Sequence, residues 1–147
     1  MIGLLQRVSQ SSVTVNGEVV GAIATGLMVL VGIEPEDSPA VADQLLHRIL
    51  NYRIFADAQG RMNVSLKNHA AGLLLVPQFT LCADTSRGLR PGFSTAAGPE
   101  LGEHLFGYLV RRAEALHAPV ASGRFGAHMQ VSLVNDGPVT FWLQSSG

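Results

Sequence analysis

The stretch with the clearest capacity for chemistry is Pro-Gln-Phe-Thr at residues 77–80, where a proline interrupts an apolar run that is otherwise typical of a central strand. Proline removes a ladder hydrogen bond, so the strand must bulge or end there. The backbone N–H groups of Gln78, Phe79 and Thr80 could then face a ligand. N–H groups aimed at one point are what an oxyanion hole needs, so this stretch is one candidate for such a site. The alternative is an edge strand with an incidental proline.

A second unusual stretch is Asn-Asp-Gly-Pro at residues 135–138, followed by the apolar Val-Thr-Phe-Trp. Proline fixes its own φ and carries no N–H, and the bond before a proline is the one peptide bond in which the cis form costs little. Cis geometry would direct the carbonyl groups of Gly137 and Pro138 almost the same way, as two rigid acceptors. The alternative is a plain hairpin turn before the last strand.

Side-chain catalysis has little support in the sequence. Thr80 is the one candidate hydroxyl nucleophile, and no base that would activate it is identifiable. Cys82, the only cysteine, follows an apolar strand and is interpreted as a core or rim residue. No Walker loop, dinucleotide fingerprint or nucleophile elbow is present. None of the histidines pair as His-x-x-x-His, so we expect neither a metal nor a cofactor. The five histidines are His47, His69, His104, His117 and His128.

The elements that must position these residues are strands with two helices among them. The predicted strands are 2–9, 26–33, 72–81, 123–134 and 138–144, with a hairpin at residues 16 and 17, and the predicted helices run from 39 to about 55 and from 99 to about 117. Residues 82–99 form a long loop, of a length that is usually functional. We therefore predict one α+β domain over residues 1–147, with a mostly antiparallel, barrel-like sheet and two main helices.

Composition restricts the partners and the compartment. Only 14% of the 147 residues are charged, which indicates that part of the surface is buried against a partner, most simply a second copy. A formal net charge of -1 argues against a tight, non-specific nucleic-acid binder, and we expect no DNA partner. The apolar run that opens the chain is too short for a signal peptide or a membrane span, and a single cysteine fits the cytoplasm.

Together the two stretches resemble the paired motifs of the bacterial D-aminoacyl-tRNA deacylases. That family reads Ser-Gln-Phe-Thr-Leu and Asn-x-Gly-Pro-Val-Thr where this chain has PQFTL (77–81) and NDGPVT (135–140). The resemblance runs from end to end, through ADTSRGLRPGF (83–93) and FGAHMQVSLVNDGPVTFWL (125–143). It implies a cytoplasmic homodimer that hydrolyses the ester between a D-amino acid and the 3′ end of tRNA. The family commonly also removes misattached glycine.

The resemblance implies that Gly137 and Pro138 form a chiral gate that enters the active site of the partner subunit. Their bond is cis in the family, and their carbonyl groups hold the α-amino group of the substrate. An L side chain would collide with this rigid pair. Arg7 matches the family arginine that braces the gate.

The resemblance also assigns Gln78, Phe79 and Thr80 to the ester pocket, with backbone amides for the oxyanion and the terminal 2′-OH of tRNA in place of a side-chain nucleophile. Pro77 departs from the family, which usually has serine there. An animal group with proline at this position accepts small L-amino acids, but it has alanine where Phe79 stands and a trans Gly-Pro bond. Arg7 and Phe79 place this chain with the D-specific group.

Three alternatives remain open on the sequence alone. Pro77 can mark a non-catalytic relative that binds the acceptor end of tRNA, or a deacylase of relaxed chirality. The chain can also be an unrelated esterase that depends on Thr80 or Cys82. For tRNA binding, Arg87 and Arg90 in the long loop are candidate phosphate contacts. Arg111 and Arg112 in the second helix are interpreted as a solvated face.

Overall fold

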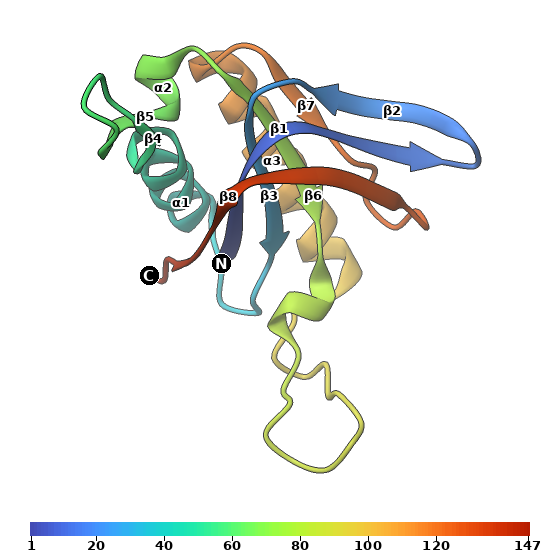
Figure 1. Cartoon of the computed structure of the whole chain (residues 1–147). Helices are drawn as coiled ribbons and strands as arrows, with labels where there is room; N and C mark the ends of the chain where they lie inside the picture. Colours follow the sequence, from blue (N-terminus) through green and yellow to red (C-terminus); the bar gives the residue numbers. More distant parts are fainter.

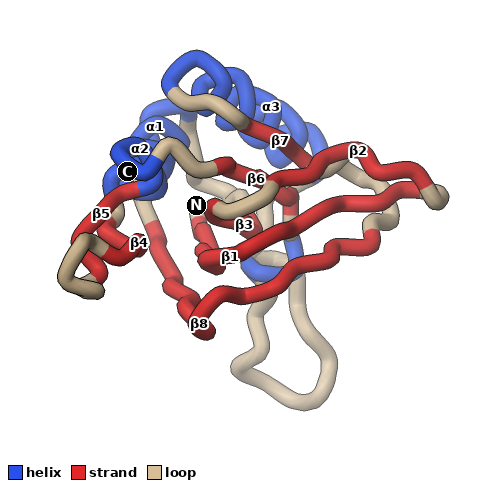
Figure 2. Tube along the Cα trace, turned by 45° about the horizontal axis from the view of Figure 1, so that its top comes forward, coloured by secondary structure: helices blue, strands red, loops and turns tan.

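Six strands form one mixed sheet that curls towards a barrel, and two long helices pack against one side of it (Figures 1 and 2). The computed structural model describes all 147 residues. The large sheet contains β1 (Ile2–Val15), β2 (Glu18–Ile23), β3 (Gly26–Gly32), β6 (Gly72–Pro77), β7 (Val120–Ser122) and β8 (Gln130–Gln144). The other elements are α1 (Pro39–Asn51), β4 (Arg53–Ala56), β5 (Met62–Ser65), α2 (Leu66–His69), the 3-10 turn η1 (Phe79–Cys82) and α3 (Pro99–Leu116). None of the helices has the length and apolar character needed to cross a membrane.

The sheet is mixed, so the prediction of a mostly antiparallel sheet holds only around β1. The order is β2-β1-β3-β6-β7, with β8 on β1. β1 is antiparallel to β2, β3 and β8, whereas β3–β6 and β6–β7 are parallel. Two parallel neighbours need a long connection, which brings the chain back to the end of the sheet where the first of them began. α1 lies in the connection from β3 to β6, and α3 lies in the connection from β6 to β7. The connections that contain the two predicted helices are therefore what allows the parallel pairing of β3, β6 and β7.

Both faces of the central strands are buried, as the continuous apolar runs predict. In β3, Leu27 and Val29 join the core cluster that includes the α1 and α3 residues, and Met28 between them joins a second cluster on the other face. The sheet nearly closes because β7 approaches β2. A Cβ added at Gly21 of β2 would lie only 2.7 Å from the Ser122 carbonyl oxygen of β7, so only glycine fits this contact.

The stretch at 135–138 is not the hairpin corner that its turn residues suggest. β8 continues through it and pairs with the same strand, β1, on both sides: Val8 lies opposite Asn135, and Gln6 lies opposite Thr140. Residues 136–139, called the bulge below, are therefore extra residues that leave the ladder. The hairpin prediction is wrong because a turn and a large bulge require the same local residues, while the pairing on either side depends on β1.

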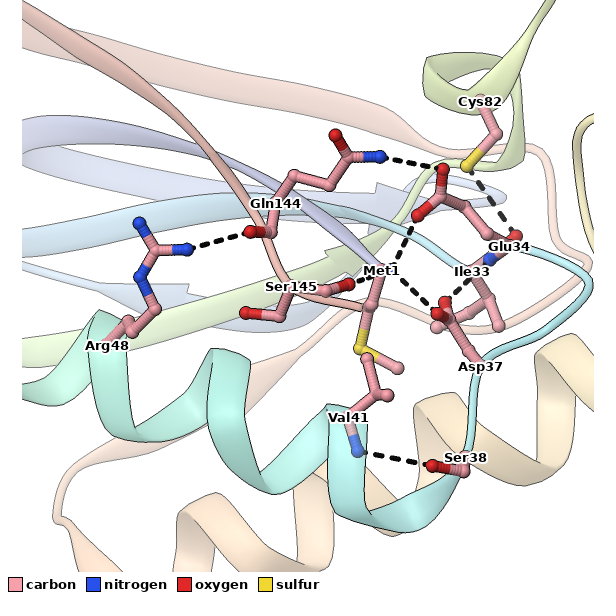
Figure 3. Close-up of polar contacts among 10 residues, drawn as sticks. All are labelled: Met1, Ile33, Glu34, Asp37, Ser38, Val41, Arg48, Cys82, Gln144 and Ser145. Carbon is pink, nitrogen blue, oxygen red and sulfur yellow. Dashed lines mark hydrogen bonds and ion pairs between the residues drawn. The ribbon is translucent and has the colours of Figure 1, made fainter. Parts of the chain in front are cut away.

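The N-terminal ammonium group ties three distant segments together (Figure 3). The Met1 amine donates to Glu34 Oε2 at 2.6 Å, to Asp37 Oδ1 at 2.7 Å and to the Ser145 carbonyl oxygen at 2.8 Å. Met1 is fully buried, and the side chain of Asp37 is only 4% exposed. The start of β1, the β3–α1 loop and the chain after β8 are thus joined by one buried cation.

We expect Asp37→Ala to lower the free energy of unfolding by about 3 kcal/mol, since it leaves a buried cation short of a counter-charge. Urea unfolding at pH 7 measures the loss. Glu36→Ala removes the same charge from an exposed neighbour that makes no ion pair, and it should change stability by no more than about 0.5 kcal/mol. Equal effects of the two variants would show that the buried cluster contributes nothing specific.

Candidate active site

A cavity of about 630 Å³ lies where β6 ends. Three segments form its walls: the end of β6 with the start of η1, the loop that leads into α3, and the loop between β7 and β8. The side chains that matter for the argument are Pro77, Gln78, Phe79, Phe93, Phe125 and Met129. Most of the lining is apolar, so a ligand here would be recognised by shape and by the few backbone groups at the rim.

Pro77 ends β6, as its missing N–H predicts, and the chain turns directly into η1. The N–H of Gln78 donates to the Val31 carbonyl oxygen at 2.8 Å and is therefore part of the sheet. In η1 the first hydrogen bond within the turn runs from Leu81 N–H to the Gln78 carbonyl. The N–H groups of Phe79 and Thr80 precede it, and such leading groups have no partner within a helical turn. Of the three predicted amides, these two suit a ligand and the Gln78 amide does not.

Neither candidate nucleophile is activated. The Thr80 hydroxyl accepts from the side-chain amide of Gln78, which is not a base. Burial raises the pKa of the Cys82 thiol to about 11, with a smaller contribution from the nearby Glu34 carboxylate, so the thiol is protonated at neutral pH. Its Sγ faces the Ile33 carbonyl oxygen (Figure 3). The interpretation of Cys82 as a core residue is confirmed.

An aromatic pair stands at the mouth of the cavity. The rings of Phe79 and Phe93 are 5.2 Å apart between centroids and tilted by 54°, and both side chains are exposed. Phe93 belongs to the predicted long loop, here residues 83–98, which projects from the end of the sheet that carries η1 (Figure 1). Arg87 and Arg90 are exposed on this loop. The loop thus brings one aromatic wall and two cations to the same side of the molecule.

The bulge presents a backbone apex with a braced base. Gly137 and Pro138 are exposed, and the peptide bond between them is cis. Arg7, which lies opposite the gap in the ladder, donates through Nε to the Asp136 carbonyl oxygen at 2.9 Å and through Nη1 to the Ile54 carbonyl oxygen at 2.9 Å. Arg7 therefore joins the bulge to β4.

Within one chain the bulge does not reach the cavity. β8 lines the cavity at Val131, near the start of the strand, and the bulge begins five residues further along. Pro77 pairs with Val31 of β3, and Val31 pairs with Gly3 of β1. The bulge lies opposite Arg7, which is four residues further along β1. No residue of the bulge lines the cavity. The bulge therefore adds nothing to the lining of this cavity within its own chain.

The profile of the family described as D-Tyr-tRNA(Tyr) deacylase matches residues 4–144. The chain belongs to this family. It is 66% identical over 145 residues to a D-aminoacyl-tRNA deacylase of Pseudomonas fluorescens, a match that covers 99% of this chain and 100% of the relative. A D-aminoacyl-tRNA deacylase of Pseudomonas putida is 67% identical over 144 residues, 98% of this chain and 99% of the relative. The resemblance seen in the two motifs is confirmed.

Two solved structures share the deacylase fold. One, described as the c-Myc DNA Unwinding Element Binding Protein, has a TM-score of 0.95 and 37% identity, and the match covers 100% of both chains. The other, described as a probable eukaryotic D-amino acid tRNA deacylase, has a TM-score of 0.83 over 97% of each chain. At 18% identity that second likeness concerns the fold alone.

Sequence reasoning missed one polar residue in this region, Asn135. Its side chain spans the base of the bulge and contacts both backbone polar groups of Val139. The signal was present, since asparagine readily bonds to backbone groups a few residues further on. It was interpreted as part of a turn, and a turn does not require such a contact. Phe93 and Phe125 were likewise not predicted to line the cavity.

Proposed function

We propose that this protein hydrolyses the ester bond between a D-amino acid and the 3′ end of tRNA, and removes glycine in the same way. The observation that carries the proposal is the near full-length match to the D-aminoacyl-tRNA deacylases, at 66% identity over 99% of the chain. The cavity beside η1 supports it, because an apolar pocket with backbone donors at its rim suits an ester. Such a substrate supports the cytoplasm as the proposed compartment.

In the proposed reaction, water adds to the ester carbonyl and the 3′ oxygen of the terminal ribose leaves with a proton. The N–H groups of Phe79 and Thr80 stabilise the oxyanion that forms on the carbonyl oxygen. Neither Thr80 nor Cys82 is activated as a nucleophile, and, as the resemblance to the deacylases implies, the terminal 2′-OH of the tRNA assists the proton transfers. Pro77 is compatible with this scheme, since the scheme uses no hydroxyl at that position.

The bulge supplies the proposed stereochemical filter. Gly137 and Pro138 of a second copy enter the cavity and offer two carbonyl oxygens to the α-ammonium group of the amino acid. A backbone filter reads groups that all amino acids share, and it rejects an L side chain by collision. Arg7 holds the filter in place through the Asp136 carbonyl.

A homodimer is part of this proposal. β8 is an edge strand of 15 residues, paired only with β1. Its exposed residues include Val134 and Trp142, which is 53% exposed. Proteins usually cover a long edge strand that has exposed apolar side chains. In the proposed dimer a second copy of the chain covers this edge and brings its own bulge to the cavity of the first.

The exposed Arg87 and Arg90 on the loop beside the cavity are proposed to contact tRNA phosphates. A near-neutral chain that holds one 3′ end through a few arginines should bind with modest affinity that falls as salt rises.

The test compares D-Tyr-tRNA, L-Tyr-tRNA and Gly-tRNA as substrates of the wild-type protein. We expect kcat/KM for the D ester to exceed that for the L ester by about 100-fold or more, because collision is a strong discriminator. Thr80→Ala should keep most of the activity, since its hydroxyl has no catalytic role in this scheme.

Each of the other outcomes of this substrate comparison would support one of the alternative functions. Binding without hydrolysis, with rescue by Pro77→Ser, would identify a non-catalytic relative. Equal hydrolysis of the D and L esters would indicate relaxed chirality. Loss of activity in Thr80→Ala or in Cys82→Ala, together with an acyl-enzyme trapped and detected by mass spectrometry, would identify an esterase that depends on that residue.

A further inference from the structure

The base of the bulge is closed by one side chain, the carboxamide of Asn135. Its Oδ1 accepts from the Val139 N–H at 2.7 Å, and its Nδ2 donates to the Val139 carbonyl oxygen at 3.2 Å. Both backbone polar groups of a single residue are thus bound by a single side chain. The amide takes the place of a neighbouring strand where the ladder between β1 and β8 is interrupted, between the Val8–Asn135 pair and the Gln6–Thr140 pair.

The same carboxamide is anchored to the sheet beneath. Nδ2 also donates to Thr140 Oγ1 at 3.0 Å and lies 3.4 Å from Gln6 Oε1 of β1. Arg7 holds the other end of the bulge at the Asp136 carbonyl. The two ends are therefore fixed from the two sides, and only the Gly137–Pro138 apex extends outwards.

We infer that Asn135 is a positioning residue that sets how strictly the apex discriminates D from L substrates. This inference rests on the proposed function, in which the apex carbonyls hold the α-ammonium group. A filter that works by collision must not yield, and an apex on an unclamped base can move away from an L side chain. Asparagine suits the position because a carboxamide of this length carries both an acceptor and a donor, whereas aspartate carries acceptors only.

The experiment measures kcat/KM for D-Tyr-tRNA and L-Tyr-tRNA in Asn135→Ala, Asn135→Asp and Ser11→Ala. Ser11→Ala is the matched control, because the Ser11 hydroxyl also bonds β1 to β8, at the Ser132 carbonyl, away from the bulge. We expect the D/L ratio to fall about tenfold in Asn135→Ala, the effect of one or two lost hydrogen bonds. Asn135→Asp, which retains only the acceptor, should fall in between, and Ser11→Ala should keep the wild-type ratio.

A purely structural role predicts a different result: both rates fall together and the ratio stays at the wild-type value, which would overturn the inference. Hydrogen exchange of the Val139 amide provides a readout without substrate. Its protection should be lost in Asn135→Ala and kept in Ser11→Ala, and unchanged protection would contradict the clamp. If the wild type shows no D/L discrimination, the proposed function fails, while the exchange measurement still tests the clamp.

Discussion

Gly137→Ala is expected to lower kcat/KM for D-Tyr-tRNA by about 100-fold or more while the protein remains folded. The φ of Gly137 is +151°, a region that residues with a side chain rarely adopt. A Cβ there would lie 2.6 Å from Val139 Cγ2 and 2.7 Å from Val139 N. Because both atoms belong to the clamped base of the bulge, the apex itself must shift.

The size of the effect follows from what the apex is proposed to bind. Each hydrogen bond to a charged group contributes about 1.5–3 kcal/mol, so weakening both carbonyl contacts to the α-ammonium group removes about 3 kcal/mol or more. That corresponds to roughly 100-fold in rate. Single-turnover deacylation measures it, and near-ultraviolet circular dichroism checks the fold.

The control is Gly107→Ala in α3, where the added Cβ meets only the flexible end of Arg111, at 3.2 Å. Alanine is the better helix former, so this variant should be as stable as the wild type or slightly more so, with unchanged activity. Wild-type rates in Gly137→Ala would mean that the apex does not touch the substrate.

Local signals in the sequence predicted the parts of the fold that depend on local chemistry. α1 begins at Pro39 as predicted, and the hydroxyl of Ser38 before it accepts from the Val41 N–H (Figure 3). Pro77 ends β6 because a proline cannot donate to the ladder, whichever neighbour it has. Asn16 and Gly17 both have positive φ and connect β1 to β2, as an Asn-Gly hairpin requires. In each case the structure depends on the residue itself and on neighbours within a few positions in the sequence.

What the sequence could not predict depends on distant partners. Asn135 to Pro138 suit a hairpin and a bulge equally well, and only the pairing of β8 with β1 on both sides decides between them. The Gln78 amide seemed available from its position after Pro77, yet it bonds to Val31 on another strand. The bulge also contributes no residue to the cavity of its own chain, which no local pattern could show.

The proposed cross-subunit site predicts complementation between two inactive variants. Gly137→Ala damages the apex and leaves the cavity intact, whereas Ala96→Trp fills the cavity, which Ala96 lines, and leaves the apex intact. Each homodimer is expected to be almost inactive. After co-refolding at equal amounts, half of the dimers are mixed and one of the two sites in each is whole. Deacylation of D-Tyr-tRNA should therefore return to about one quarter of the wild-type rate.

Two controls decide what a recovered rate means. Ala96→Trp co-refolded with Ala127→Trp combines two filled cavities, so no pairing of subunits yields a whole site and the rate must stay low. The two original variants mixed without refolding should recover only as fast as subunits exchange. If apex and cavity of the same chain worked together, every site in a mixed dimer would contain one defect. The rate after co-refolding would then remain that of the inactive homodimers, and the cross-subunit arrangement would have to be abandoned.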